Sequence, residues 1–241
     1  MKKLRKFVAV LLALSMSAVS SMPAFAAEDV KRDVPDLLTT PQKQIESIER
    51  IGTPEQIVQV KDKLSGNRSN PFSLERVRTV TISVPHYAQT GHPTWCAVFT
   101  AKQTLAYING TIPSTSSLAS AMGATDETEY IDIQTLLDVL NDRQSHTGYA
   151  QVGVYSIDDM LNEFYYAIIG DYPPIPVIDT YRHVSDFGYD AVHYLNVSGI
   201  NTGTNKVFIV DPGRSGTAGV KWIANSLMYD VIKDYDNVIL C

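Results

Sequence analysis

Cysteine is scarce in this sequence of 241 residues, which holds only Cys96 and Cys241. Two cysteines are too few for a scaffold held together by many disulfides, and these two do not stand at the short spacing of a zinc site. The sequence also lacks a His-Glu-x-x-His motif and the Lys-Ser/Thr pair of a phosphate-binding loop. We therefore expect neither a metal ion nor another cofactor at the functional site.

Long hydrophobic runs are equally scarce. One extends from Phe7 to about Val19, after Met-Lys-Lys-Leu-Arg-Lys and before Ala24-Phe25-Ala26. A short apolar run between basic residues and small residues is typical of a secretory signal peptide, here of bacterial type. We expect residues 1–26 to be removed after Ala26 and the protein to be secreted. No later run approaches the length of a membrane span, so we expect no membrane contact once the signal has been cleaved.

Basic residues are outnumbered by acidic ones, at 20 Lys and Arg against 26 Asp and Glu. Residues 1–26 contain four basic residues and no acidic one, so the mature chain would hold 16 basic and 26 acidic residues, a net charge of −10. Proteins that bind nucleic acids need basic surfaces to contact phosphates, and this balance argues against such a partner. We also expect the protein to be a monomer.

Residues 27–75 contain no aromatic residue before Phe72 and are rich in Lys, Glu, Gln and Asp. Thr40 before Pro41, and Thr53 before Pro54, are typical helix starts and predict two short amphipathic helices. This N-terminal extension is either a part that packs on the domain or a prosegment that restrains the protein by reaching across its cleft. Both interpretations remain open at this point, and the compact domain is expected to span residues 76–241.

A hydrophobic content of 44% in 241 residues supports one domain with a sizeable core. The patterns predict a helical first half and a strand-rich second half, and therefore an α+β fold with a cleft between an antiparallel sheet and a group of helices. The helices are expected from Cys96, over 117–122 and 133–141, after Ser156, and over 220–232. The strands are expected over 77–84, 175–181, 192–198, 206–210 and 237–240, with a hairpin turn over 199–205.

Cys96 stands at the first turn of a segment that reads as a buried helix. Unpaired backbone N–H groups and the positive end of the helix dipole favour an anion there, which is how a thiol becomes a thiolate near neutral pH. The alternative is a structural disulfide between Cys96 and Cys241, which a secreted chain with two cysteines also allows. The helix start favours the reactive thiol.

A nucleophilic thiolate needs a base within hydrogen-bond reach and a group that orients the base. His193 is the best placed of the five histidines, near the start of the strand over 192–198. Asp211 directly follows the next strand, and pairing of these strands would bring its carboxylate close to His193. Gln89 precedes the cysteine in its loop and is placed to donate its amide to an oxyanion beside the Cys96 backbone N–H.

Three further residues are candidate substrate contacts. Trp95 and His92 precede the cysteine, and His183 lies in a loop that we expect to overhang the cleft. His183 is also the main competitor of His193 for the role of base. An ordinary strand histidine and an aspartate that starts a turn are the alternative interpretation of His193 and Asp211.

The order Gln89, Trp95-Cys96-Ala97, His193 and Asp211-Pro212 resembles papain-like cysteine peptidases, in particular the C39-like group of bacterial peptidases. The Trp-Cys-Ala triplet is also similar to that of the staphopains. The resemblance extends from about Val77 to the end of the chain. Two features depart from it, because Ala97 stands where many relatives have Gly, and plant-type relatives have Asn in place of the aspartate.

This resemblance implies a papain-like domain over residues 76–241 that hydrolyses a peptide or protein substrate through an acyl-thioester. It implies Cys96 as nucleophile, His193 as base, Asp211 as the residue that orients the base, and Gln89 as oxyanion donor. A cell-wall amidase of the NlpC/P60 or CHAP type is the alternative enzyme. A secreted binding protein without catalysis, held by a disulfide between the two cysteines, is the alternative from a different class.

Overall fold

The computed structural model describes residues 36–66, 79–128 and 130–241, and these belong to one compact unit, Asp36–Cys241. The expected signal peptide lies outside the described residues. The helices are α2 (Pro41–Ile51), α3 (Pro54–Ser65), α4 (Cys96–Asn109), α5 (Thr115–Met122), α6 (Ile133–Asp142), α7 (Ile157–Ile169), α8 (Val184–Phe187) and α9 (Asn225–Asp234), with the 3₁₀ turn η2 (Gly216–Ala218). The strands are β1 (Val80–Thr81), β2 (Gln151–Gly153), β3 (Ile175–Asp179), β4 (Val192–Tyr194), β5 (Asn196–Asn201), β6 (Lys206–Val210), β7 (Val220–Ala224) and β8 (Val238–Leu240).

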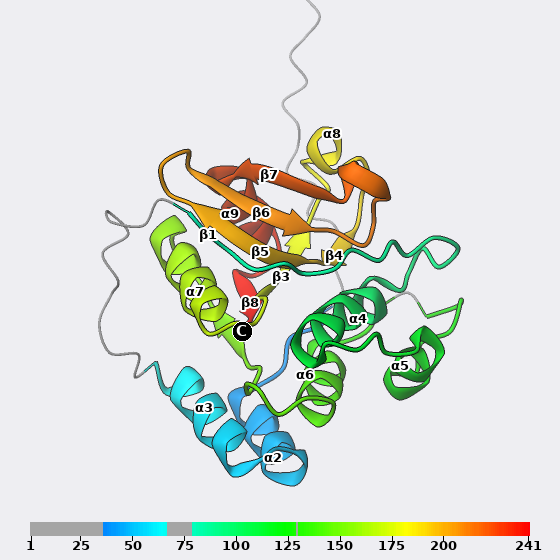
Figure 1. Cartoon of the computed structure of the whole chain (residues 1–241), viewed down its shortest axis with the longest axis vertical. Coiled ribbons are helices and arrows are strands. Elements are labelled where there is room, and N and C mark those ends of the chain that lie inside the picture. The colour runs from blue at the N-terminus through cyan, green and yellow to red at the C-terminus, as the bar shows by residue number, and fades with distance from the viewer. Residues whose placement is uncertain (1–35, 67–78, 129) are drawn as a thin grey trace, which may run out of the picture. The chain divides into compact units, whose positions relative to one another are not determined.

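The strands form two antiparallel sheets of four. One has the order β1-β5-β6-β7 and the other the order β2-β8-β3-β4. Helices α4, α5 and α6 form a separate group beside the sheets, with α4 nearest to β4 and β5 (Figure 1). The structure is therefore the expected α+β fold, with a helical half that carries the cysteine and an antiparallel half that carries the histidine and the aspartate.

The strand predicted over residues 192–198 is in fact two strands that belong to different sheets. β4 pairs with β3, where His193 lies opposite Ile178, whereas β5 pairs with β6, where Asn196 lies opposite Val210. The chain crosses from one sheet to the other at Leu195, which is fully buried. Alternation alone did not reveal this break, because the residues on both sides of it are buried and continue the same pattern.

The helix predicted over residues 220–232 is also wrong in its first part. Val220–Ala224 is strand β7, which pairs with β6 along its whole length, and α9 begins only at Asn225. The half-exposed Trp222 contacts Phe208 of β6, with ring centroids 5.1 Å apart. Pairing with an already formed strand thus outweighs the helical spacing of the apolar residues in this segment.

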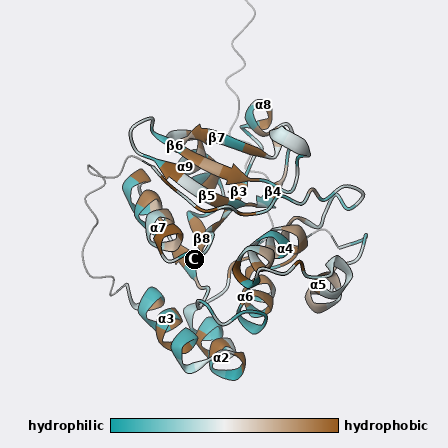
Figure 2. Cartoon of the chain, viewed as in Figure 1, coloured by the Kyte–Doolittle hydropathy of each residue, from teal (hydrophilic) through white to brown (hydrophobic). Residues whose placement is uncertain are grey.

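The N-terminal extension contains the two expected helices, α2 and α3, with Thr40 and Thr53 at their caps. They pack against each other, α2 lies on α6, and α3 approaches β2 (Figure 1). Figure 2 shows hydrophilic residues along much of their surfaces, while Ile48 and Val60 face inward onto Ala150. The expected crossing of the cleft is absent from the described part of this segment, residues 36–66.

Candidate active site

Cys96 is the first residue of α4, directly after Trp95, and its side chain is partly exposed. The side chain of His193 and the backbone N–H groups of Tyr194 and Ala97 lie next to the sulfur. The Ala97 contact is a direct consequence of the helix start, where amide groups have no partner within the helix. The helix therefore places a thiol where three donors can stabilise its ionised form.

Hydrogen bonds from buried polar residues of α4 fix this helix against the strands. Thr100 Oγ1 donates to the Tyr194 carbonyl oxygen at 2.9 Å, and Thr104 Oγ1 donates to Asn196 Oδ1 at 2.8 Å. Asn196 Nδ2 donates to the Thr100 carbonyl oxygen at 3.2 Å and to Gln103 Oε1 at 2.9 Å. These hydrogen bonds hold the chain on both sides of its crossing between the sheets. They therefore fix the position of the start of α4 relative to His193.

His193 and Asp211 form a buried pair, with exposed fractions of only 3% and 1%. His193 Nε2 lies 2.8 Å from Asp211 Oδ1, which leaves the other ring nitrogen, Nδ1, for the thiol. The crossing at Leu195 explains this geometry. Asp211 follows Val210, the partner of Asn196, so it lies beside the crossing and close to the end of β4.

Two further donors hold the carboxylate of Asp211. The Gly213 backbone N–H donates to Oδ1 at 2.7 Å, and the Tyr189 hydroxyl donates to Oδ2 at 3.1 Å. The Tyr189 ring also lies against the imidazole, with ring centroids 4.9 Å apart. A Cβ atom on Gly213 would stand 3.1 Å from Asp211 Oδ1, His193 Cε1 and Tyr189 Cε1, so glycine is the residue that lets this turn pack so tightly.

The electrostatics of the three groups favour an ion pair between the cysteine and the histidine. Burial lowers the pKa of His193, but the charge of Asp211 and the hydrogen bonds to Asp211 and Cys96 outweigh it and raise that pKa from 6.5 to about 10. Burial raises the pKa of Cys96, but the hydrogen bond and charge of His193 outweigh it, and the pKa falls below its ordinary 9.0. Both shifts favour the charged pair, a thiolate beside an imidazolium, over the neutral thiol and imidazole.

The pKa of Asp211 shows the same coupling. Burial raises it, but the charge of His193 and the hydrogen bonds to His193, Gly213 and Tyr189 outweigh burial and lower it from 3.8. Burial and the nearby carboxylate raise the pKa of Tyr189 well above its ordinary 10, so its hydroxyl remains a neutral donor. Asp211 is accordingly an ionised acceptor that holds the ring of His193 in one orientation.

Gln89 is tied to the same region through its backbone and its side chain. Its backbone N–H donates to the Pro212 carbonyl oxygen at 2.9 Å, and its Nε2 donates to the Pro93 carbonyl oxygen at 2.7 Å. A side-chain amide nitrogen has two hydrogens. The contact with Pro93 therefore anchors the amide and leaves one N–H for a further acceptor.

The three candidate substrate contacts are placed differently from one another. Trp95 and His92 are stacked, with ring centroids 3.9 Å apart, and they hydrogen-bond or pair with Thr125 and Asp126 respectively. Trp95 and His92 therefore lie side by side in the loop that precedes the cysteine. His183 lies 3.7 Å from Asp234 of α9 and has no hydrogen bond or ion pair with His193 or the cysteine among the described residues.

Two residues near the site were not assigned a role by the sequence. Tyr189 lies in an irregular segment with no pattern that marks it. His86 lies in the loop before the cysteine, and its Nε2 donates to the Asp211 carbonyl oxygen at 2.9 Å. Both contacts join segments that are distant in the sequence, and only knowledge of the sheet pairing could have revealed them.

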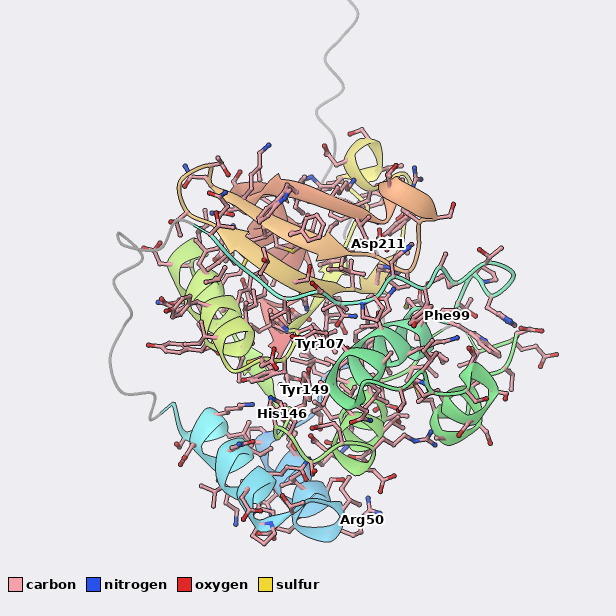
Figure 3. The ribbon with its side chains drawn as sticks, in the orientation of Figure 1. Arg50, Phe99, Tyr107, His146, Tyr149 and Asp211 are labelled. Carbon is pink, nitrogen blue, oxygen red and sulfur yellow. The ribbon has the colours of Figure 1, made fainter. Side chains whose placement is uncertain are left out.

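A pocket of about 430 Å³ adjoins the histidine and is called here the His193 pocket. One wall consists of residues 88–91 and 93 in the loop before the cysteine, and the other consists of residues 189–191, 193 and 212–215. In Figure 3, Asp211 lies beside the sheet, whereas Arg50 of α2 lies at the opposite side of the molecule. Cys96 does not line the pocket.

Comparison with known proteins identifies the family. The model of the peptidase C39-like family matches residues 81–238, which include all four candidate catalytic positions. The chain belongs to the peptidase C39-like family. A crystal structure described as that of a candidate C39-like peptidase from Bacillus anthracis has a TM-score of 0.50 at 12% sequence identity, covering 68% of this chain and 96% of that one. No curated protein matches the sequence.

This C39-like chain thus has the fold of a cysteine peptidase family, as its sequence motifs predicted. The structural likeness, at 12% identity, supports the fold alone. Within the described ranges, no group of three His, Cys, Asp or Glu side chains is arranged to hold a metal ion. Over the same ranges, no helix is long and apolar enough to cross a bilayer.

Proposed function

We propose that this C39-like chain is a secreted cysteine peptidase that uses Cys96, His193 and Asp211. The observation that carries the proposal is the buried pair of His193 and Asp211, with Nε2 and Oδ1 2.8 Å apart, beside a thiol at a helix start whose pKa the imidazole lowers. A structural histidine would need neither an oriented carboxylate nor a neighbouring thiol. Membership of the family supports peptidase chemistry in general.

Acylation follows from the thiolate and imidazolium. The sulfur of Cys96 attacks the carbonyl carbon of the scissile bond, and the carbonyl oxygen becomes an oxyanion. The free N–H of Gln89 and the backbone N–H of Cys96 are proposed to stabilise that oxygen. His193 then gives its proton to the departing nitrogen, the C–N bond breaks, and an acyl-thioester remains on the sulfur.

Hydrolysis of the thioester returns the site to its starting state. Neutral His193 removes a proton from a water molecule, the hydroxide attacks the carbonyl carbon, and the C–S bond breaks to release the acid. Asp211 stays ionised throughout and keeps the imidazole oriented, which is the role of the third member in such sites. The substrate is a peptide or protein, and the expected signal peptide over residues 1–26 would deliver the enzyme outside the cell.

Alkylation of the two cysteines tests this function. Iodoacetamide at neutral pH is expected to modify Cys96 much faster than Cys241, because Cys241 is fully buried, with its thiol directed to Glu163 at 3.4 Å. Modification is followed by intact mass and peptide mapping, and cleavage of a synthetic peptide library is measured in parallel. Cys96→Ala is expected to abolish cleavage, with Cys241→Ala as the matched control that retains it.

Each alternative function gives a distinct result in the same experiment. Cleavage of purified cell-wall peptide but not of the library would indicate an amidase. Equal labelling of the two cysteines, or a disulfide between them in the purified protein, would contradict the peptidase proposal and favour a binding protein. In the structure both cysteines are free thiols.

A further inference from the structure

The His193 pocket lies where the second half of a cleaved substrate would sit. In the proposed mechanism, the acyl half of the substrate is bonded to Cys96, whereas the departing amine receives its proton from His193. The pocket is lined by His193 and Gln89 and not by Cys96. It is therefore on the side of the leaving group, and it would contact the residues that follow the scissile bond.

Arg214 is the cation built into this pocket. Its guanidinium lies against Gly188, where the missing side chain makes room for it, since a Cβ atom there would stand 2.0 Å from Arg214 Nη1. Nη1 donates to the Gly188 carbonyl oxygen at 3.3 Å. Nε and Nη2 have no hydrogen-bond partner among the described residues. The guanidinium is therefore held in place by Gly188 and still has N–H groups that can donate to a ligand.

His193 and Asp190 are the other charged groups that line the pocket, and among the described residues Arg214 forms no ion pair with Asp190. Asp190 is exposed, and the hydrogen bond of Arg214 goes to the backbone oxygen of Gly188. The remaining lining residues are small or neutral, such as Ala88, Gly91 and Ala191. Pro93, Pro212 and the Tyr189 ring add apolar surface that has no directional preference, so the directional group of the wall beside the catalytic residues is the half-buried guanidinium.

Resting on the proposed peptidase function, we infer that Arg214 binds a carboxylate of the leaving segment and makes the enzyme selective for substrates with such a group just after the scissile bond. The carboxylate is either the side chain of Asp or Glu or the C-terminal carboxylate of a short leaving peptide. A guanidinium recognises both through the same paired N–H geometry.

Cleavage of a peptide library by wild type and Arg214→Gln tests the inference. In the wild type, the first two positions after the cut are expected to be enriched in Asp, Glu or a free C-terminus. Matched peptides are then compared that carry either Glu or Gln at the preferred one of these positions. Arg214→Gln is expected to reduce the ratio of kcat/KM for the Glu peptide to kcat/KM for the Gln peptide by about tenfold, the usual scale of one charge-assisted hydrogen bond. Arg214→Glu is expected to reverse the preference toward Lys and Arg.

Three controls accompany this test. They separate a loss of recognition from a loss of folding, and a terminal carboxylate from a side-chain carboxylate. Arg182→Gln removes an arginine that lies 3.9 Å from Asp234 and outside the pocket, and it is expected to keep the wild-type preference. Peptides with a free or an amidated C-terminus distinguish the terminal carboxylate from a side chain. Thermal unfolding of each variant shows whether it is folded.

The outcomes distinguish this inference from the function on which it rests. A wild-type enzyme that cleaves Glu and Gln peptides equally, or a preference that survives in Arg214→Gln, overturns the role of Arg214 and leaves the peptidase function standing. If no peptide is cleaved although Cys96 reacts with iodoacetamide, peptides are tested for how well they protect Cys96 from the reagent. Equal protection by acidic and amidated peptides then overturns the role of Arg214. If Cys96 is also unreactive, the peptidase function itself fails.

Discussion

Replacement of Gln56 by Ala should strongly destabilise the protein, although this residue lies in the N-terminal extension. Gln56 is 1% exposed, and its Nε2 faces three backbone carbonyl oxygens, of Gln144 at 2.8 Å, Thr147 at 3.1 Å and Asn141 at 3.2 Å. Its Oε1 accepts the backbone N–H of Thr53 at 2.8 Å and completes the cap of α3. One side chain therefore holds both the extension and the loop after α6.

The size of the effect follows from counting donors. Nε2 has two hydrogens for three acceptors, and Thr147 also receives Gln144 Nε2 at 2.6 Å, so the substitution leaves the carbonyl oxygens of Gln144 and Asn141 without a donor. A buried polar group without a partner costs about 1 to 3 kcal/mol, so the two together cost about 2 to 6 kcal/mol. Loss of the cap contact adds about 0.5 to 1 kcal/mol. Because water can enter the vacated space, we expect about 3 kcal/mol, a large fraction of the stability of a typical domain.

Denaturation in urea, followed by tryptophan fluorescence, measures this loss. Gln42→Ala is the matched control, since Gln42 lies on the exposed surface of α2 and bonds only Glu46 there. It should change the free energy of unfolding by less than about 0.5 kcal/mol. Gln56→Glu should be less stable at pH 8 than at pH 5, because an ionised carboxylate repels the carbonyl oxygens whereas the protonated acid donates one hydrogen. A Gln56→Ala variant as stable as Gln42→Ala would refute the reasoning.

Three further predictions concern the site. Asp211→Asn should keep part of the turnover, because Asn still accepts a hydrogen bond from the imidazole. It should also move the alkaline limb of the pH profile to lower pH, because the active form needs protonated His193. Burial lowers the pKa of His193, and the variant loses the charge of Asp211 that raises this pKa to about 10. His193→Ala should lower kcat by about a hundredfold or more, whereas His183→Ala should retain most activity, and the reverse result would show that the base is misassigned. His86→Leu should lower kcat more than KM and His86→Gln should restore it, because Gln can still donate to the Asp211 carbonyl oxygen; equal kcat in both variants would show that this hydrogen bond is irrelevant.

Local signals in the sequence predicted the helices well. Thr40, Thr53 and Ser156 cap their helices as expected, since each side chain accepts a backbone N–H three residues later and needs no distant partner. The position of Cys96 at the start of α4 follows from the same kind of local information. The ordered motifs around Gln89 and Cys96 were enough to indicate the family.

Pairing between strands was less predictable. The crossing at Leu195 and the strand Val220–Ala224 depend on which strands lie next to them, and β2 is stabilised by pairing with β8 near the other end of the chain. The role of Tyr189 depends on its contact with Asp211, which joins two segments separated by β4, β5 and β6. Such features are decided by tertiary packing, which overrides the periodicity of a single segment.

The crossing at Leu195 also explains why the largely apolar buried face of α4 includes the polar residues Thr100, Gln103 and Thr104. An apolar helix face could pack against the strands in several registers, because hydrophobic contact is not directional. The hydrogen bonds from Thr100 and Thr104 to Tyr194 and Asn196 are satisfied in one register only. Buried polar contacts of this kind are costly when broken, so they select that register. The consequence is functional, since a shift of α4 by one residue would rotate its first side chain away from the imidazole.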